Sequence, residues 1–327
     1  MFRPRIIFFG TDEFSAPILH KLLDMDREKI IDLVGVVTKP DTYNHGHAVP
    51  PVVARVAREF NNEFNRSVPI FQSTSLATIT VALAALEPDA GVLASFGKII
   101  PNSTLALFAT RYTRNDRQTI GAGIINFHPS LLPKLRGPSP IETTILNGDR
   151  ETGLTLIRLA EQMDAGAILY QEKIALTGRE TASQLRDQFS QRGAKIIRDK
   201  LVNLVENNPT GTTQTESDAT FSHIIQKSYA VLDPTELTAA EADRHVRAFN
   251  IWPKARLNFA KTRAHLYANF PDQNIILTDT TPLKIAPGDG WPDVIEFANH
   301  TTLKINKIIS PKSGKDMTMD EYLRGLK

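Results

Sequence analysis

Three polar residues, Asn126, His128 and Asp164, have types and spacings that suit proton-transfer chemistry. Asn126 lies within the apolar run 124–127, and His128 follows that run directly. Because strand side chains alternate with a period of two, we expect both polar groups to project from the same side. Pro129 cannot donate to a strand ladder and disfavours helical dihedrals at His128, so the strand should end there.

A second strand-like run at 153–159 leads to the turn-like sequence Met-Asp-Ala-Gly at 163–166, which contains Asp164. If this turn folds back onto the end of the first strand, an amide, an imidazole and a carboxylate meet in one cleft. An Asn near the end of a strand, a His before Pro and an Asp in a turn are also ordinary structural features. The spacing alone therefore leaves a structural interpretation open.

The chemistry open to such a group is the transfer of an acyl or formyl unit between two nitrogens. The imidazole of His128 can accept a proton from an attacking amine and return it to a leaving nitrogen. The amide of Asn126 can donate to the oxyanion of a tetrahedral centre, an interaction worth about 3–4 kcal/mol. The carboxylate of Asp164 favours the imidazolium form. A covalent enzyme intermediate is not required, and we expect no metal at this site.

The elements that position these residues read as an α/β fold. The run 5–10 is a buried strand, apolar residues from Phe14 to Leu23 recur at helical spacing, and 32–38 is the next strand. This strand–helix–strand pattern predicts a mostly parallel sheet with flanking helices. A further strand at 90–94 ends in the loop 95–101, which should lie beside His128 at the carboxyl ends of the strands. The first turn lacks the Gly-x-Gly-x-x-Gly pattern, so a dinucleotide site is poorly supported.

Composition divides the chain into two structured parts. The 327 residues exceed the usual size of one domain. The polar, threonine-rich segment 206–222 is typical of a linker. Beyond it a helix at 237–249 precedes short strand-like runs, which predict a small barrel or sandwich, and a closing helix at 319–326. The short runs lie at 255–260, 264–268, 283–286, 294–297 and 303–309.

Charge and cysteine content exclude several classes of protein. A net charge of +2 gives no global field for nucleic acid, and the lack of cysteine excludes disulfides and thiolate chemistry. The first apolar run is too short for a secretion signal, and no run approaches the length of a membrane span. We therefore expect a cytoplasmic protein.

Local basic patches occur in the second part. No acidic residue lies between Arg244 and Asp272, or from Phe297 to Gly314. Such patches could follow a phosphate backbone, or they could be ordinary solvated faces.

The quoted residues also carry a family resemblance. The sequence from Asn126 to Gly137, the run Gly-Leu-Thr-Leu from Gly153 and the Asp164 turn resemble the folate-dependent formyltransferases. In that family an Asp follows the His by 36 residues, as Asp164 follows His128 here (164 − 128 = 36). The resemblance implies a Rossmann-like catalytic domain, 10-formyltetrahydrofolate as the formyl donor, and Asn126, His128 and Asp164 as catalytic residues. It also implies folate contacts, largely through backbone, at Phe96, Gly97, Ile99, Ser130, Leu131, Leu132, Pro133 and Gly166.

The second part resembles the C-terminal domain of the tRNA-formylating branch of that family, an OB-like barrel. The matching segments are 247–253 and 309–317. This implies a catalytic domain at 1–206, a linker at 207–225 and an OB-like tRNA-binding domain at 226–327. The implied acceptor is the α-amino group of initiator methionyl-tRNA, bound by a monomer without membrane contact. The implied tRNA-binding residues are Arg136, Arg247, Lys254, Arg256, Lys312 and Lys315.

One segment departs from the family. Its members have a basic loop after the second strand that enters the tRNA acceptor arm, whereas residues 42–48 contain two histidines and no Lys or Arg. Either the acceptor is recognised by other residues, or the acceptor differs. The alternatives are a formyltransferase for an amino-sugar nucleotide and an inactive folate- or RNA-binding relative.

Overall fold

The computed structural model describes residues 3–109, 111–114, 117–258, 274–284 and 293–325. The chain forms two compact units. The first comprises residues 1–137, 153–174 and 186–221, and the second comprises 138–152, 175–185 and 222–327. The second unit therefore includes two segments that the sequence assigned to the catalytic domain, and the first includes most of the predicted linker.

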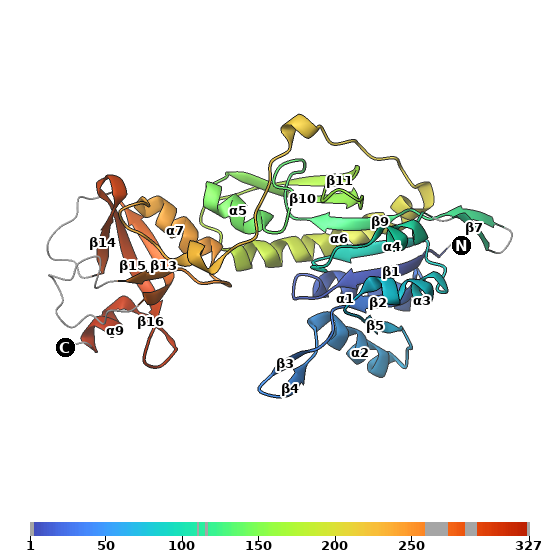
Figure 1. Cartoon of the computed structure of the whole chain (residues 1–327), viewed down its shortest axis with the longest axis horizontal. Coiled ribbons are helices and arrows are strands. Elements are labelled where there is room, and N and C mark those ends of the chain that lie inside the picture. Colours follow the sequence, from blue (N-terminus) through green and yellow to red (C-terminus); the bar gives the residue numbers. More distant parts are fainter. Residues whose placement is uncertain (1–2, 110, 115–116, 259–273, 285–292, 326–327) are drawn as a thin grey trace. The chain divides into compact units, whose positions relative to one another are not determined.

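A seven-stranded sheet in the order β11-β10-β9-β6-β1-β2-β5 organises the first unit (Figure 1). From β9 to β5 the neighbouring strands are parallel, and β10 pairs antiparallel with β9. The mostly parallel α/β fold predicted from the sequence is thus confirmed. The strands are β1 Arg5–Gly10, β2 Asp32–Thr38, β5 Ile70–Gln72, β6 Ala90–Ala94, β9 Ile124–His128, β10 Glu151–Arg158 and β11 Ile168–Ala175.

Helices cover both faces of this sheet because the central strands are apolar on both sides. On one face Ile7, Phe9 and Ile124 pack with Leu83 and Phe108 from the segment around the short helices α3 and α4. The other helices of the unit are long and amphipathic. The helices are α1 Ala16–Arg27, α2 Val52–Phe64, α3 Thr80–Ala84, α4 Asn102–Leu107 and α6 Ala182–Asn207, with a 3-10 turn at Leu76–Thr78.

The strand order reverses between β1 and β6, because the chain runs outward from β1 through β2 and then returns to β6 on the other side. Ligands of open α/β sheets bind outside the carboxyl ends of the strands at such a reversal. The register there is continuous: Val37 pairs with Phe9, Phe9 with Leu93, and Leu93 with Asn126. Asn126 therefore lies next to the point where a substrate crevice is expected.

The segment that takes the place of the family's basic loop has regular structure. In it, β3 Thr42–Asn44 and β4 His47–Val49 form an exposed antiparallel hairpin. Its turn contains His45 and Gly46, both with positive φ. The sequence reading overlooked the helix α5 Pro140–Asn147 and a second hairpin, β7 Arg111–Arg114 with β8 Arg117–Ile120.

A separate antiparallel sheet forms the centre of the second unit, in the order β12-β13-β15-β14 with β16 beside β15. Ile275, Leu303 and Ile305 of this sheet pack with Val246 of α7 and Met319 of α9 in one core. The predicted run 264–268 lies outside the described residues, and the long strand β13 was not predicted. The elements are α7 Ala239–Ala248, β12 Arg256–Asn258, β13 Asn274–Leu283, β14 Val294–Phe297, β15 Thr301–Ile309, β16 Asp316–Thr318 and α9 Met319–Arg324, with 3-10 turns at Lys227–Ala230 and Ala298–His300.

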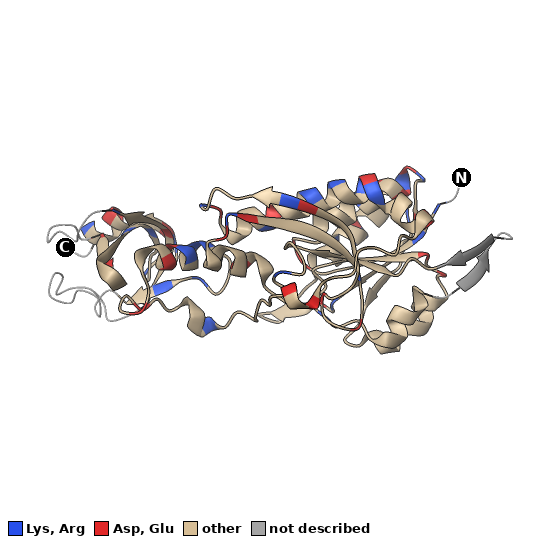
Figure 2. Ribbon diagram, turned by 90° about the horizontal axis from the view of Figure 1, so that it is seen from above, with Lys and Arg blue, Asp and Glu red and all other residues tan. Residues whose placement is uncertain are grey.

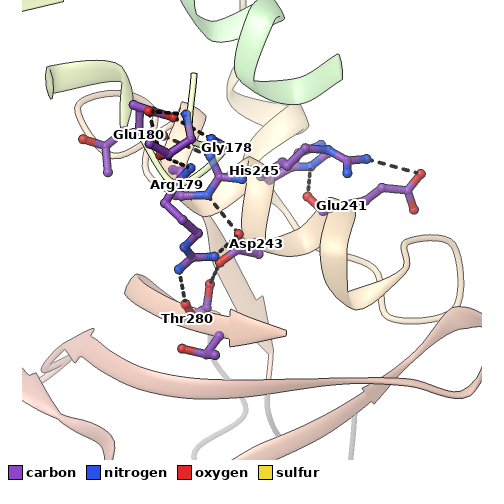
Figure 3. A network of polar contacts seen from close by, with 12 residues as sticks. Gly178, Arg179, Glu180, Glu241, Asp243, His245 and Thr280 are labelled. Atoms are coloured by element: carbon purple, nitrogen blue, oxygen red, sulfur yellow. Dashed lines mark hydrogen bonds and ion pairs between the residues drawn. The ribbon is translucent and has the colours of Figure 1, made fainter. Parts of the chain in front are cut away.

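A buried carboxylate joins three segments of the second unit (Figure 3). Asp243 of α7, 2% exposed, accepts from Arg179 and Arg247 at 2.9 Å each. Its other oxygen accepts from the hydroxyl of Thr280 on β13, also at 2.9 Å. Arg247 additionally donates to the carbonyl of Glu180. A buried charge is tolerated when it is paired and hydrogen-bonded in this way, so Asp243 anchors the segment 175–185 to α7 and β13.

Charges of both signs are interspersed over the described residues (Figure 2). This distribution agrees with the small net charge of the sequence. In the part of the chain that the structure describes, no helix combines the length and apolarity needed to cross a bilayer.

The imidazole of His245 makes the stability of the second unit dependent on pH. Burial, reinforced by the neighbouring Arg244, lowers the pKa of His245 from its ordinary value of 6.5, although Nδ1 contacts the carbonyl of Glu241. His245 therefore binds a proton more readily in the unfolded chain than in the folded chain. As a result, the free energy of unfolding falls as pH drops through about 6.5. The lowered pKa values of Glu180 and Glu241 act only below about 4.5.

We expect the urea midpoint of the second unit to be lower at pH 5.5 than at pH 7.5, and His245→Gln to reduce this difference. Tryptophan fluorescence is a suitable measurement, because both tryptophans of the chain lie after residue 222. The control is His223→Gln, which replaces an exposed histidine of the same unit. An equal pH difference in the His245 variant and the wild type would contradict the assignment.

Candidate active site

The strand β9 presents Asn126 and His128 from the same side of the sheet, as the sequence predicted. Both side chains are buried, at 6% and 4% exposure, although they are polar. Neighbouring strands enforce this position, since Asn126 pairs with Leu93 of β6 and with Ile157 of β10. Buried polar groups need hydrogen-bond partners, and these partners define the site.

The hydrogen bonds of His128 fix its tautomer. Nε2 lies 2.8 Å from the carbonyl oxygen of Leu135, so Nε2 carries a hydrogen and donates to that oxygen. Nδ1 then faces the carboxylate of Asp164, 3.5 Å from Oδ2. This separation exceeds a direct hydrogen bond but lies within range of an ion pair, so Nδ1 is the nitrogen that can accept a proton.

Asp164 joins the turn at 163–166 to β9. Its Oδ2 accepts from the backbone N–H of Gly137 at 2.9 Å, and its Oδ1 lies 3.4 Å from Nδ2 of Asn126. Asp164 adopts a φ of 51°, and the turn packs tightly behind it. A Cβ at Gly166 would stand 1.7 Å from the carbonyl oxygen of Arg158, so only glycine fits there. The structure thus brings the three predicted residues together.

Two residues of the neighbouring strands hold the loop that follows His128, and the sequence reading missed both. The hydroxyl of Thr155 donates to the carbonyl of Ser130 at 2.6 Å. The amide of Gln171 donates to the carbonyl of Leu132 at 3.0 Å and to the hydroxyl of Thr155 at 2.9 Å. The alternation of β10 and β11 could have indicated inward polar side chains, but their partners depend on the tertiary fold.

The residues predicted to contact folate differ in exposure. Ser130, Leu132 and Phe96 are 1–3% exposed, and Phe96 packs edge-to-face on Phe9 with ring centroids 5.7 Å apart. The side chain of Ile99 is 85% exposed, and Gly97 offers bare backbone with a φ of 66°. Leu131 and Pro133 are partly exposed, and Gly166 is buried. Only some of these residues can therefore touch a ligand with their side chains.

The segment predicted as a linker is part of the site, because residues 212–221 lie along its loops. The amide of Gln214, 8% exposed, donates to the carbonyls of Asp164 and Gly166 at 2.7 and 2.8 Å. The backbone and hydroxyl of Thr220 accept from the N–H groups of Arg136 and Leu135. Residues 212–221 are thus hydrogen-bonded to the loops of the site, and we call them the strap.

Arg136 lies between this strap and the catalytic loop. It is 1% exposed; its Nε donates to Gln214 and its Nη1 to the carboxylate of Glu216. A guanidinium enclosed in this way leaves little surface for the tRNA contact that the sequence predicted for Arg136. Its contacts instead connect the loop after His128 to the strap.

The other predicted tRNA contacts lie in the second unit. The side chain of Arg247 is 11% exposed and its guanidinium is bound to Asp243, so little surface is left for a ligand. Lys254 and Arg256 are partly exposed, and Lys312 and Lys315 are exposed. In the described part of the chain, no cluster of three or more His, Cys, Asp or Glu side chains could hold a metal ion.

Comparisons with known proteins agree with this geometry. Residues 4–201 match the formyl transferase family. The chain is 32% identical over 333 residues to the methionyl-tRNA formyltransferase of Bacillus mycoides (strain KBAB4), covering 99% of this chain and 96% of the relative. It is 31% identical over 326 residues to the protein of the same name from Bacillus cereus (strain AH820), with the same coverage.

Solved structures share the fold at low identity. HypX from Aquifex aeolicus in complex with tetrahydrofolic acid has a TM-score of 0.62 and 13% identity, over 99% of this chain and 48% of that chain. An N-formyltransferase from Helicobacter canadensis has a TM-score of 0.60 and 16% identity, over 93% of this chain and 99% of that chain.

An amide, an imidazole and a carboxylate lie together at the carboxyl ends of a mostly parallel sheet, and such a set of groups suits group transfer assisted by proton transfer. The family match covers more than half of the chain, and full-length relatives exceed 30% identity. The chain belongs to the formyl transferase family.

Gln214 is expected to be a positioning residue for Asp164. Replacing it by Leu leaves two buried carbonyls and the Nε of Arg136 without their partner, which costs about 1–3 kcal/mol for each buried group. We expect Gln214→Leu to lower kcat of formyl transfer by about tenfold or more, with a smaller change in the KM of either substrate. Steady-state kinetics with each substrate varied in turn measures this split.

The matched control is Gln191→Leu, the same substitution at an exposed position of α6. A kcat of Gln214→Leu within twofold of the wild type would show that the strap does not act on Asp164.

Proposed function

We propose that this protein transfers the formyl group of 10-formyltetrahydrofolate to the α-amino group of initiator methionyl-tRNA. The observation that carries the proposal is the position of His128, whose Nδ1 faces Asp164 at 3.5 Å with Asn126 beside it. Full-length relatives that bear the name methionyl-tRNA formyltransferase support this choice of acceptor.

The reaction follows from the assigned tautomer. The acceptor amine attacks the formyl carbon, and Asn126 donates an N–H to the oxygen that becomes negative. His128 accepts the proton of the amine at Nδ1, because Nε2 is already engaged with Leu135. Asp164 stabilises the imidazolium that results. The proton then passes to the departing nitrogen, so one C–N bond forms and one breaks without a covalent enzyme intermediate.

The donor binds, in this proposal, between the loop at 96–99 and the turn at 163–166. It supplies the formyl carbon that the amine attacks. The bare backbone of Gly97 and the exposed side chain of Ile99 suit a flat, partly apolar ring, and Leu131 and Pro133 add partly exposed apolar surface. The tetrahydrofolic acid bound to the structural neighbour HypX is consistent with such a donor.

The second unit binds the body of the tRNA in this proposal, as an OB-like barrel. The strands of its described sheet are antiparallel, and the exposed or partly exposed cations Lys254, Arg256, Lys312 and Lys315 can pair with phosphates. We further propose that the enzyme acts as a monomer in the cytoplasm, where charged initiator tRNA is used for translation.

An amino-sugar nucleotide is the second candidate acceptor. The hairpin at 42–49 contains no Lys or Arg, unlike the basic loop expected of a tRNA-formylating enzyme. The neighbour from Helicobacter canadensis was solved with dTDP-3-aminofucose, and a nucleotide of that kind needs no basic arm.

The two acceptors are distinguished by a formyl-transfer assay with 10-formyltetrahydrofolate and either charged initiator tRNA or an amino-sugar nucleotide. We expect transfer to the tRNA alone. His128→Asn should lower kcat/KM by about 10²–10⁴-fold, the usual contribution of a positioned general base. Transfer to the sugar nucleotide alone would reject the proposed acceptor, and an unchanged rate in His128→Asn would reject the mechanism with either acceptor.

A further inference from the structure

The hairpin at 42–49 contains no Lys or Arg, but basic residues follow two strands of the sheet and one lies on α2. Lys39 follows β2 directly, Lys98 lies in the loop after β6, and Arg58 projects from α2. Gln72 at the end of β5 links two of them, since its Oε1 accepts from Arg58 at 2.6 Å and its Nε2 donates to the backbone carbonyl of Lys39 at 3.1 Å.

The ammonium of Lys39 has no hydrogen-bond or ion-pair partner among the described residues, although its side chain is partly buried. It rests on Gly97: a Cβ at that position would stand 2.6 Å from Nζ of Lys39. The positive φ of Gly97 and the absence of a side chain let the ammonium approach the loop backbone. Lys39 therefore holds its charge against the loop that follows β6 while all three N–H donors remain available.

The hydrogen-bond partners of Lys98 are neutral, so they do not compensate its positive charge. Its Nζ donates to the backbone carbonyls of Ser73 and Thr74 at 2.8 and 2.7 Å. Carbonyls orient an ammonium without neutralising it. Lys98 is thus a fixed positive charge after β6, next in sequence to the glycine on which Lys39 rests.

The carboxylates nearest in sequence and fold are occupied by other groups. Asp12 accepts from Ser95 Oγ at 2.6 Å and from Ser15 Oγ at 3.3 Å, and Arg186 lies 4.0 Å from it. Asp41 accepts from Nε2 of Gln72 at 2.6 Å. No ion pair joins either carboxylate to Lys39, so the ammonium of Lys39 is not directly neutralised by either of them.

The sheet register places Val37, two residues before Lys39, on the same face as Asn126, two residues before His128. Val37 and Asn126 lie in one row across β2, β1, β6 and β9, and Lys39 and His128 each follow two residues later. The row crosses three strand spacings of about 4.8 Å from β2 to β9, so Lys39 and His128 lie about 14 Å apart. A substrate that reacts at His128 can therefore reach Lys39 with an anionic group that lies about 14 Å from its reacting atom.

We propose that Lys39, which rests on Gly97 without a partner of its own among the described residues, is a binding subsite for a substrate oxyanion. The anion is either a phosphate near the 3′ end of the acceptor or a glutamyl carboxylate of the folate, both of which an ammonium binds as a point charge. The inference rests on the proposed function for the identity of the substrates. The subsite explains why the hairpin needs no Lys or Arg, because Lys39 at the end of β2 binds the anion instead.

The test is Lys39→Gln in the full-length protein, with Lys21→Gln on α1 as the matched loss of one charge. Lys21 is paired with Asp24 at 3.3 Å and lies in a helix rather than at a strand end. Losing a charge-assisted contact of about 1.5 kcal/mol corresponds to about a tenfold rise in KM. We expect this rise for one substrate of Lys39→Gln, with kcat within twofold of the wild type and recovery in Lys39→Arg.

Three substrates identify the source of the anion. A rise for charged initiator tRNA, with a salt dependence shallower by about 0.7–0.9 in log–log slope, assigns a phosphate. A rise for both monoglutamyl and triglutamyl 10-formyltetrahydrofolate assigns a carboxylate of the first glutamate, and a rise for the triglutamyl form alone assigns a carboxylate further along the tail. Values within twofold of the wild type for all three overturn the subsite.

Failure of the proposed function gives a different result. If the wild type formylates only an amino-sugar nucleotide, the tRNA acceptor is rejected. A raised KM for that nucleotide in Lys39→Gln still supports the subsite, because a nucleoside diphosphate carries the same oxyanions. An unchanged KM for both the nucleotide and the folates rejects the subsite as well.

Discussion

The carboxylate of Asp164 makes the contacts that hold the loops of the site together. Its two oxygens face the N–H of Gly137, the amide of Asn126 and the imidazole of His128, so one side chain connects the end of β9, the loop after it and the turn after β10. A carboxylate is tolerated at such depth only when its partners are fixed. The sheet fixes Asn126 and His128, and the strap fixes the backbone of Asp164. The chemistry of the site is therefore a consequence of how its loops are held.

Much of this arrangement could be predicted from the sequence, because it follows from local rules. The period of two in β9 placed Asn126 and His128 on one side, and Pro129 ended the strand. The parallel sheet followed from alternating strands and amphipathic helices. The strap could not be predicted, since Gln214, Glu216 and Thr220 act through single tertiary hydrogen bonds, and a polar, threonine-rich composition is the same for a linker and for a segment bound in this way.

The partners of the charged residues likewise could not be predicted from the sequence. A sequence lists the arginines but not their partners, and Arg136 and Arg247 are both held by acids of their own unit. Lys39, which no motif singles out, has no such partner among the described residues. Burial and pairing, rather than the local density of Lys and Arg, decide which cations can meet a ligand.

The strap also sets an order of events during synthesis. Thr220 lies 85 residues after Leu135, whose N–H it accepts, and Gln214 lies 50 residues after Asp164. At roughly 5–20 residues per second, a ribosome exposes β9 several seconds before the strap can bind. During that interval the loops around Asp164 lack the support of the strap, and a chain that stops near residue 206 would contain Asn126, His128 and Asp164 without the segment that holds them.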